Sequence, residues 1–396
     1  MSIQPAERMA NIGQETAFEV LVRARALEAA GRHVVHLEIG EPDFDTPSHI
    51  VSAGQQALEE GYTHYGPGAG LLDLRQAVCR YLQRWRGLDV EPERVIITPG
   101  GKPVMFFTIL ALVNPGDEVI YPDPGFPIYE SMARFVGGTP VPMPLREERH
   151  FRFDPDEFRS LVTDRTRLII INSPHNPTGG VLTHADLEVI ADVARERDIV
   201  VMSDEIYARI LYTGRHESIA TFPDMLDRTI ILDGWSKTWA MTGWRLGFGV
   251  FPRELVPHVE RLISNSVSCT ASFSQKAAMA ALDGPQDAVD SMLDEFTRRR
   301  TAIVDGLNAL PGVRCLQPDG AFYAFPNITA TGYSSRELAD ALLQDAGVAC
   351  LSGTAFGSYG EGFLRFSYAN SLDNIQLALE RMRGLLDRAP RAVARL

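Results

Sequence analysis

Short apolar runs alternate with helix-like segments through the middle of this chain, from about residue 48 to residue 283. The run at 167–172 is almost continuously β-branched, which is typical of a strand buried on both faces of a parallel sheet. The alternation predicts an α/β fold with a mainly parallel sheet sandwiched by helices. Strands are expected at 94–98, 118–121, 167–172, 199–202, 229–232 and 247–251. Helices are expected at 14–30, 48–60, 103–113 and 185–197.

Polar or glycine-rich loops follow these strands, and each carries a residue suited to ligand binding. The carboxyl ends of parallel strands meet at one edge of a sheet, and ligands of such sheets bind there. We therefore expect one site at this edge. Its candidate residues from successive loops are Gly101, Phe126, Asn176, Asp204 and Lys237.

A second, smaller unit is expected after the helix-breaking pair Gly284-Pro285. The pattern there changes to one long helix followed by short strands and two further helices, which is typical of an α+β domain. An N-terminal strand at 34–39 joins it. We expect a large domain at 46–285 and a small domain formed by 1–45 and 286–396. The elements expected after the break are helices at 286–310 and 335–345, strands at 313–316, 321–325 and 362–368, and a final helix ending near 387.

Composition excludes several classes of protein. The chain has 396 residues with a net charge of −13, and neutralising the phosphates of nucleic acid requires a basic face. The longest apolar stretch, 104–113, is too short to cross a bilayer, and the N-terminus lacks a signal pattern. The cysteines are far apart and form no CxxC pair, so we expect free thiols and a cytoplasmic protein. His33 and His36 have no cluster of metal-site spacing around them.

Lys237 is the most reactive candidate. It follows the run 229–232 directly, and Trp235 and Trp239 flank it. Partial desolvation disfavours an ammonium, so the amine becomes a nucleophile near neutral pH. With Arg245 eight residues later, this arrangement suits an aldehyde cofactor that carries a phosphate. The alternative is an exposed lysine beside a salt-bridged arginine.

The segment Ser236-Lys-Thr-Trp-Ala-Met-Thr-Gly-Trp-Arg-Leu-Gly247 resembles the lysine signature of class I/II aminotransferases. These are fold type I enzymes that use pyridoxal 5'-phosphate (PLP) and act as dimers with shared active sites. The resemblance covers nearly the whole chain in five ordered motifs. It implies that Lys237 forms a Schiff base with the cofactor aldehyde, that Arg245 binds the phosphate, and that Ser236 belongs to the cofactor site.

The phosphate end of the expected site is the loop Pro99-Gly-Gly-Lys102 before an apolar helix. Its glycines let the backbone approach an anion, and the helix N-terminus faces it, so Gly101 is a candidate phosphate contact. The loop is neither a P-loop nor a GxGxxG dinucleotide loop. The resemblance adds Tyr65, which in relatives reaches the cofactor phosphate of the other subunit. A packed surface tyrosine is the alternative.

The ring end of the expected site includes an acid and three partners. An acid at the end of an apolar strand requires a compensating charge, and the resemblance makes Asp204 the partner of the protonated pyridine nitrogen. A helix N-cap is the alternative for Asp204. The resemblance implies that Asn176 and Tyr207 donate to the phenolate oxygen and that Phe126 stacks on the ring. The alternative for Phe126 is an ordinary core position.

Four residues are expected to meet the substrate. Arg365 stands mid-strand among aromatic residues, and its planar fork suits a carboxylate; the resemblance assigns it the substrate's α-carboxylate. An internal salt bridge is the alternative. Gly40, in Gly-Glu-Pro-Asp-Phe, lies against that carboxylate in relatives, or is only a turn residue. Asn176 is also expected to contact the substrate. Lys102 is the candidate for a distal carboxylate, because some relatives carry a lysine there.

The expected activity is amino transfer between an L-amino acid and a 2-oxo acid, with aspartate and 2-oxoglutarate as first guesses and without strict selectivity. The best-known aspartate aminotransferases use a partner-subunit arginine for the side-chain carboxylate, and residues 262–297 here contain no arginine. They also stack the ring with a tryptophan whose N–H donates to that carboxylate, which Phe126 cannot do. A PLP-dependent β-lyase or another Cα-carbanion enzyme is the alternative. A PLP-binding transcription regulator is disfavoured because no basic arm precedes the motifs, and a nicotinamide dehydrogenase because GxGxxG is missing.

Overall fold

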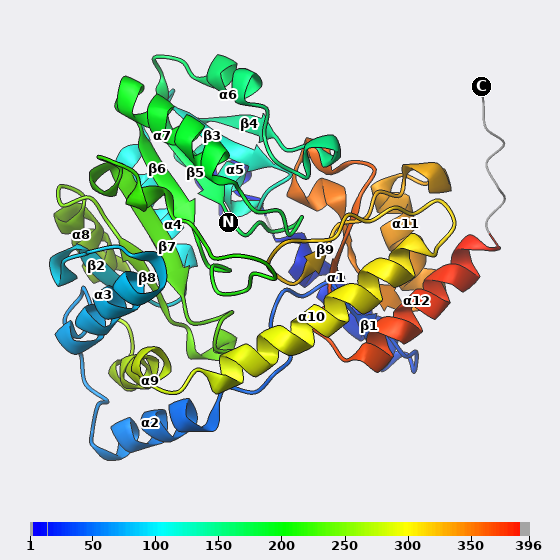
Figure 1. Cartoon of the computed structure of the whole chain (residues 1–396), viewed down its shortest axis with the longest axis horizontal. Helices are drawn as coiled ribbons and strands as arrows, with labels where there is room; N and C mark the ends of the chain where they lie inside the picture. Colours follow the sequence, from blue (N-terminus) through cyan, green and yellow to red (C-terminus); the bar gives the residue numbers. More distant parts are fainter. Residues whose placement is uncertain (1–2, 14, 389–396) are drawn as a thin grey trace.

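A seven-stranded sheet forms the centre of the molecule in the computed structural model, which describes residues 3–13 and 15–388 (Figure 1). Its strand order is β2-β8-β7-β6-β5-β3-β4, and all neighbours are parallel except β8, which runs antiparallel to β2 and β7. The predicted mainly parallel sheet is therefore confirmed. The strands are β2 (Val95–Thr98), β3 (Glu118–Asp123), β4 (Thr139–Pro144), β5 (Thr166–Asn172), β6 (Val200–Asp204), β7 (Thr229–Gly234) and β8 (Gly247–Val250).

Helices cover both faces of the sheet. Along β5, Leu168 and Ile170 pack with residues of α4 (Lys102–Leu112), whereas Ile169 and Ile171 pack with residues of α7 (His184–Arg197). Alternate side chains of one strand thus enter two different cores, which explains why the strand is apolar at successive positions. The remaining helices of this part are α2 (Ser48–Glu59), α3 (Leu72–Arg86), α5 (Ile128–Phe135), α6 (Pro155–Leu161), α8 (Val256–Ser266) and α9 (Ser272–Asp283).

Segments from the N-terminal and C-terminal parts of the chain come together in the smaller part of the molecule, beside the long helix α10 (Asp287–Asn308) (Figure 1). The N-terminal strand β1 (Val35–His36) pairs in parallel with β10 (Val348–Ala349). A three-stranded antiparallel sheet has the order β11-β12-β9. The division of the chain into domains at residues 45 and 285 remains a prediction. The other elements here are α1 (Thr16–Ala29), β9 (Tyr323–Ala324), α11 (Ser335–Ala341), β11 (Leu351–Ser352), β12 (Leu364–Ser367) and α12 (Leu372–Leu386).

The prediction of a strand at 313–316 is wrong. Within this segment only Arg314 forms a bridge, to Asn327. The side chain of Asn308 bonds both backbone polar groups of Cys315, at 2.8 Å to its N–H and 3.0 Å to its carbonyl, and so takes the place of a neighbouring strand. In the C-terminal unit, the helix expected at 335–345 ends its α-helical part at Ala341 and continues as a π-helical turn.

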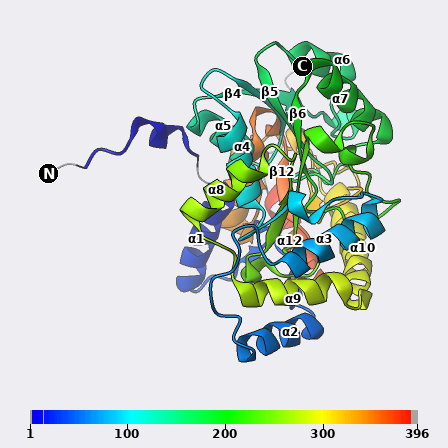
Figure 2. The same ribbon diagram turned by 90° about the vertical axis from the view of Figure 1, so that its left-hand side faces the viewer.

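The described residues before α1 form an arm at the surface, and the N–H of Gly13 in this arm donates a 2.7 Å hydrogen bond to Ser131 Oγ of α5. Figure 2 shows the described part of this arm, which contains a 3-10 helix at Glu7–Asn11, projecting beside α1 (Figure 2). Within residues 3–13 and 15–388, every helix is too short or too polar to span a membrane.

Candidate functional site

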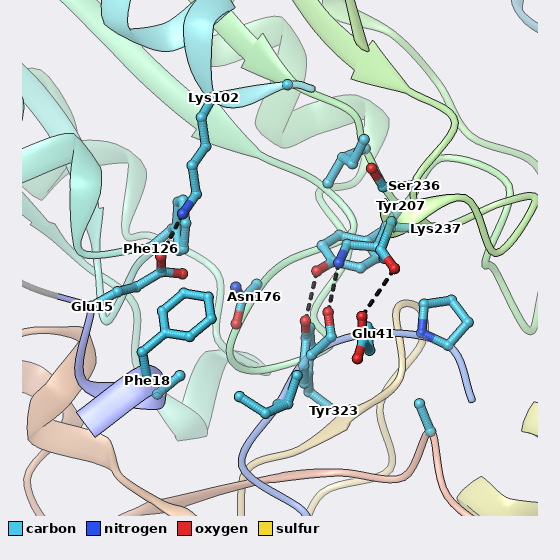
Figure 3. Close-up of a pocket in the computed structure, with 18 of the residues that line it drawn as sticks. Glu15, Phe18, Glu41, Lys102, Phe126, Asn176, Tyr207, Ser236, Lys237 and Tyr323 are labelled. Carbon is cyan, nitrogen blue, oxygen red and sulfur yellow. Dashed lines mark hydrogen bonds and ion pairs between the residues drawn. The ribbon is translucent and has the colours of Figure 1, made fainter. Parts of the chain in front are cut away.

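A cavity of about 960 Å³ lies at the carboxyl ends of the parallel strands, between the large sheet and the smaller part of the chain (Figure 3). Every predicted site residue except Tyr65 lines it. Those residues are Gly40, Gly101, Lys102, Phe126, Asn176, Asp204, Tyr207, Ser236, Lys237, Arg245 and Arg365. The side chain of Tyr65 is 90% exposed on the surface and is not part of the cavity wall.

Lys237 lies in the turn that follows β7. Its Nζ donates a hydrogen bond of 2.5 Å to the backbone carbonyl of Gly40, which belongs to the N-terminal segment. Burial lowers the pKa of Lys237 to about 8, with Glu41 opposing and Arg365 reinforcing the change. In a fraction of the molecules the Lys237 amine is therefore uncharged and nucleophilic near neutral pH. The flanking tryptophans are buried in the core and are not part of the cavity wall.

Asp204 ends β6 and is only 6% exposed. Tyr129 Oη donates to its Oδ2 at 2.8 Å, and the N–H of Ile206 donates to Oδ1 at 3.2 Å. No helix begins at this point in the described chain, so the helix-cap alternative does not apply. Burial raises the pKa of Asp204 to about 7, although both hydrogen bonds favour the ionised form. A cation placed against this carboxylate would compensate the burial.

A buried ionic cluster lies behind Asp204, and no sequence pattern indicated it. Arg86 of α3 pairs with Glu205 at 2.8 Å and also with Asp233, which belongs to β7. His216 lies 3.0 Å from the same carboxyl group of Glu205. Glu205 directly follows β6, so Arg86 ties the ends of two neighbouring strands together. The negative charges of Asp233 and Glu205 also contribute to the raised pKa of Asp204.

Tyr207 meets a residue that the sequence had not singled out. Its hydroxyl lies 2.6 Å from that of Tyr323, which comes from β9 in the smaller part of the chain. Gly40 lies against the same hydroxyl, because a Cβ on Gly40 would stand 2.1 Å from Tyr323 Oη. A side chain at position 40 would therefore push the hydroxyl of Tyr323 away from that of Tyr207. Tyr323 occurs in the aromatic stretch 321–325, where nothing distinguishes it from core residues.

Arg365 of β12 is buried at the cavity wall. Its Nη1 donates to Asn176 Oδ1 at 3.1 Å, and its Nη2 donates to the backbone carbonyl of Glu38. Among the described residues Nε has no hydrogen-bond partner and no carboxylate lies within ion-pair distance, so the internal salt bridge is not observed. A buried guanidinium paired only with neutral oxygens suits an incoming carboxylate. Because Asn176 Oδ1 is taken by Arg365, the amide N–H₂ remains as its donor group.

Arg245 and the N-terminus of α4 define another end of the cavity. Arg245 Nη1 donates to the carbonyl of Thr242 at 2.9 Å, and its guanidinium is exposed to the cavity. Gly100 has a φ of +91°, and a Cβ there would stand 2.3 Å from Arg245 Nη2. Gly101 precedes α4, and Ser236 lines the same cavity. An arginine, glycine backbone and a helix N-terminus are groups that can bind an anion together.

Lys102 begins α4 and turns its ammonium toward the carboxylate of Glu15, with which it forms an ion pair (Figure 3). Two aromatic rings lie near the same ammonium, with their centroids 5.7 Å away for Phe126 and 5.9 Å away for Phe18. The ring of Phe126 also packs edge-on against Tyr129 at 5.8 Å. Glu15 and Phe18 come from the N-terminal segment, where the sequence indicated only an amphipathic helix.

These groups fit a phosphorylated pyridine aldehyde. A buried lysine amine can bond an aldehyde, a buried acid can hold a ring cation, and an anion site stands at another end of one cavity. Asp204 in particular is costly to bury as an anion unless a cation faces it. The donor set therefore fits pyridoxal phosphate on the chemistry of these residues.

Comparison with known proteins gives consistent results. The sequence profile of the family described as "Aminotransferase class I and II" matches residues 32–382. An aspartate aminotransferase of Pyrococcus horikoshii is 41% identical over 96% of this chain and 97% of its own length. An aromatic-amino-acid aminotransferase of Thermococcus litoralis is 42% identical over 89% of this chain and 92% of its own length. The structure of Thermus thermophilus aspartate aminotransferase with maleate superposes with a TM-score of 0.92 at 36% identity, covering 97% of this chain and all of that one.

Proposed function

Because this chain belongs to the aminotransferase class I and II family and is a PLP-dependent aminotransferase of fold type I, we propose that aspartate is an amino donor and 2-oxoglutarate an acceptor. One observation carries the choice of dicarboxylates. The ammonium of Lys102 stands in the cavity wall and binds a carboxylate there, that of Glu15. Relatives named as aspartate aminotransferases support the same substrate class.

Pyridoxal phosphate, when bound, supplies an aldehyde and a ring that stabilises negative charge at the substrate's Cα. We propose that Lys237 would hold the aldehyde through Nζ in the resting enzyme. Once the substrate's amino group has taken its place there, the freed Nζ would accept the Cα proton as a general base. Its lowered pKa and its place in the cavity support this role. Asp204 would hold the ring nitrogen in its cationic form, and Phe126 would pack against the ring.

The remaining roles concern orientation. We propose that Arg365 binds the substrate's α-carboxylate next to Gly40, and its unpartnered Nε supports this. The amide N–H₂ of Asn176 and the hydroxyl of Tyr207 would donate to the ring oxygen of the cofactor. The phosphate would lie at the anion site formed by Gly101, Ser236 and Arg245, together with the N-terminus of α4.

We also propose a homodimer. Tyr65 is 90% exposed in a glycine-rich loop, and the projecting arm exposes Ile3 (91%) and Met9 (49%). A partner subunit would cover these side chains, and each Tyr65 would serve the other subunit's phosphate. Sedimentation should then give twice the chain mass, and Tyr65→Phe should weaken PLP binding without dissociating the dimer. The cysteines Cys79, Cys269, Cys315 and Cys350 are free, which supports a cytoplasmic location.

The experiment that tests the substrate class uses Lys102→Ala. For aspartate and glutamate, kcat/KM should fall by a factor that corresponds to about 1.5–3 kcal/mol of transition-state binding, the range for hydrogen bonds to a charged group. For alanine and phenylalanine it should barely change. Lys276→Ala is the matched control, because Lys276 pairs with Asp73 and is not part of the cavity wall. An equal fall for all four substrates would place Lys102 in the phosphate site instead. A parent enzyme inactive on aspartate would overturn the proposed donor.

A further inference from the structure

Glu15 connects the N-terminal segment to the cavity. It directly precedes α1, and its carboxylate forms an ion pair with the ammonium of Lys102 at the start of α4. The Glu15 side chain is 22% exposed and that of Lys102 is 48% exposed, so the pair lies at the open side of the cavity. Figure 3 shows both side chains on the opposite side of Asn176 from Lys237 (Figure 3).

The ion pair has a direct chemical consequence for substrates with a second carboxylate. The Glu15 carboxylate is the same functional group as the side chain of aspartate or the distal end of 2-oxoglutarate. A dicarboxylate that approaches Lys102 therefore meets a cation already paired with an anion of its own kind. Two carboxylates at one ammonium repel each other, so the substrate has to replace Glu15.

Neutral substrates meet a different surface. Phe18 lies one helical turn after Glu15, so both side chains fall on the same side of the N-terminal segment. With Lys102 neutralised by Glu15, the rings of Phe18 and Phe126 flank the ammonium at 5.9 and 5.7 Å. Phe18 is 56% exposed, and it leaves apolar surface for a substrate side chain to cover.

We propose that Glu15 is a specificity-determining residue that competes with the substrate's distal carboxylate for Lys102. Aromatic side chains bind with the Glu15–Lys102 pair intact, whereas dicarboxylates bind by taking the place of Glu15 on Lys102. One cavity then serves both substrate classes, and Glu15 sets the ratio between them. The inference rests on the proposed function, because it assigns Lys102 to the distal carboxylate.

The test compares Glu15→Gln with Glu19→Gln in the PLP-loaded enzyme. Glu19 lies one turn further along α1, is exposed and is not part of the cavity wall, so its variant makes the same change of net charge. Glu15→Gln should raise the ratio of kcat/KM for aspartate to that for phenylalanine about two- to fivefold, the range for a solvent-accessible ion pair. The increase in this ratio should come from a lower KM for aspartate. Glu19→Gln should leave the ratio unchanged.

Binding of unreactive analogues gives a second measurement that does not depend on turnover. Glu15→Gln should tighten binding of succinate relative to 3-phenylpropionate by the same factor. In the Lys102→Ala background the effect of Glu15→Gln should vanish, because the group they compete for is gone. An equal change for both analogues, or an effect that persists without Lys102, would overturn the inference. If the parent enzyme fails to use aspartate, the proposed donor fails, while the analogue ratio still decides the role of Glu15.

Discussion

Tyr129, at the start of α5, donates a 2.8 Å hydrogen bond to the Oδ2 of Asp204 at the end of β6. Both groups are buried, and the bond opposes the rise in the pKa of Asp204 that burial causes. Oδ1 is oriented separately by the N–H of Ile206. The hydroxyl of Tyr129 thus orients the carboxylate that we assign to the ring nitrogen and favours its ionised form.

We therefore expect Tyr129→Phe to lower kcat by about tenfold or more, from the loss of a hydrogen bond to a charged group worth roughly 1.5–3 kcal/mol. The pKa of Asp204 should rise further, so the acid limb of the pH–rate profile should move to higher pH. Tyr121→Phe is the control, since Tyr121 is buried in β3 beside Glu130 rather than against Asp204. If Tyr129→Phe left both kcat and the pH–rate profile unchanged, Tyr129 would have no role in orienting or ionising Asp204.

Asp204 should destabilise the cofactor-free protein above pH 7. Its pKa is about 7 in the folded chain and 3.8 as the ordinary reference, so the folded state binds more protons between these values. Stability then falls as pH rises from about 4 to 7, and the cost is fully present above pH 7. Asp204→Asn should stabilise the cofactor-free protein at pH 8, on the order of a few kcal/mol, and much less at pH 4.

Urea unfolding of parent and variant at pH 4 and pH 8 measures this difference. In the same variant, activity should fall severely, because a neutral amide does not hold a cationic ring nitrogen. Equal stability changes at the two pH values would show that Asp204 is not the titrating group. Turnover of Asp204→Asn close to that of the parent would contradict the role assigned to Asp204.

Arg86 should matter for stability rather than for chemistry. Its replacement leaves Glu205 and Asp233 buried without their cation, and breaking a buried ion pair from one side costs about 3–5 kcal/mol. We expect Arg86→Met to lower the urea midpoint accordingly. Arg84→Met, two residues earlier on the exposed face of α3, should have little effect. Equal midpoints for the two variants would contradict the structural role of the cluster.

Lys237→Ala should fold and bind PLP without the covalent bond. Borohydride reduction should attach the cofactor mass to the parent and to Lys276→Ala, but not to Lys237→Ala. Turnover should be lost because Lys102 is the only other lysine that lines the cavity in the described chain, and it is paired with Glu15. Rapid multiple turnover by Lys237→Ala would refute the assignment.

The strands and the loops that follow them were predictable because their signals are local. Apolar runs marked β5, β6 and β7, and the amide, acid and lysine at their carboxyl ends predicted the site. Tyr323 and Glu15 carry no such signal, since each reaches the site from a distant part of the chain. Tyr129 lies only three residues after Phe126, but nothing in the sequence shows that its hydroxyl meets Asp204. Arg86 was equally hidden, because an arginine on an amphipathic helix ordinarily faces solvent. Only packing shows that this one faces two buried acids.

The two walls of the cavity differ in burial, and this difference bears on how substrate range can diverge in evolution. Asp204 and Arg365 are buried, and a substitution there also changes the stability of the fold. Glu15 and Phe18 stand on a partly exposed segment, where most changes alter stability by about 0.5 kcal/mol or less. Substitutions at these positions therefore change the free energy of unfolding very little. New donor preferences can arise there by single substitutions while the reaction chemistry stays constant.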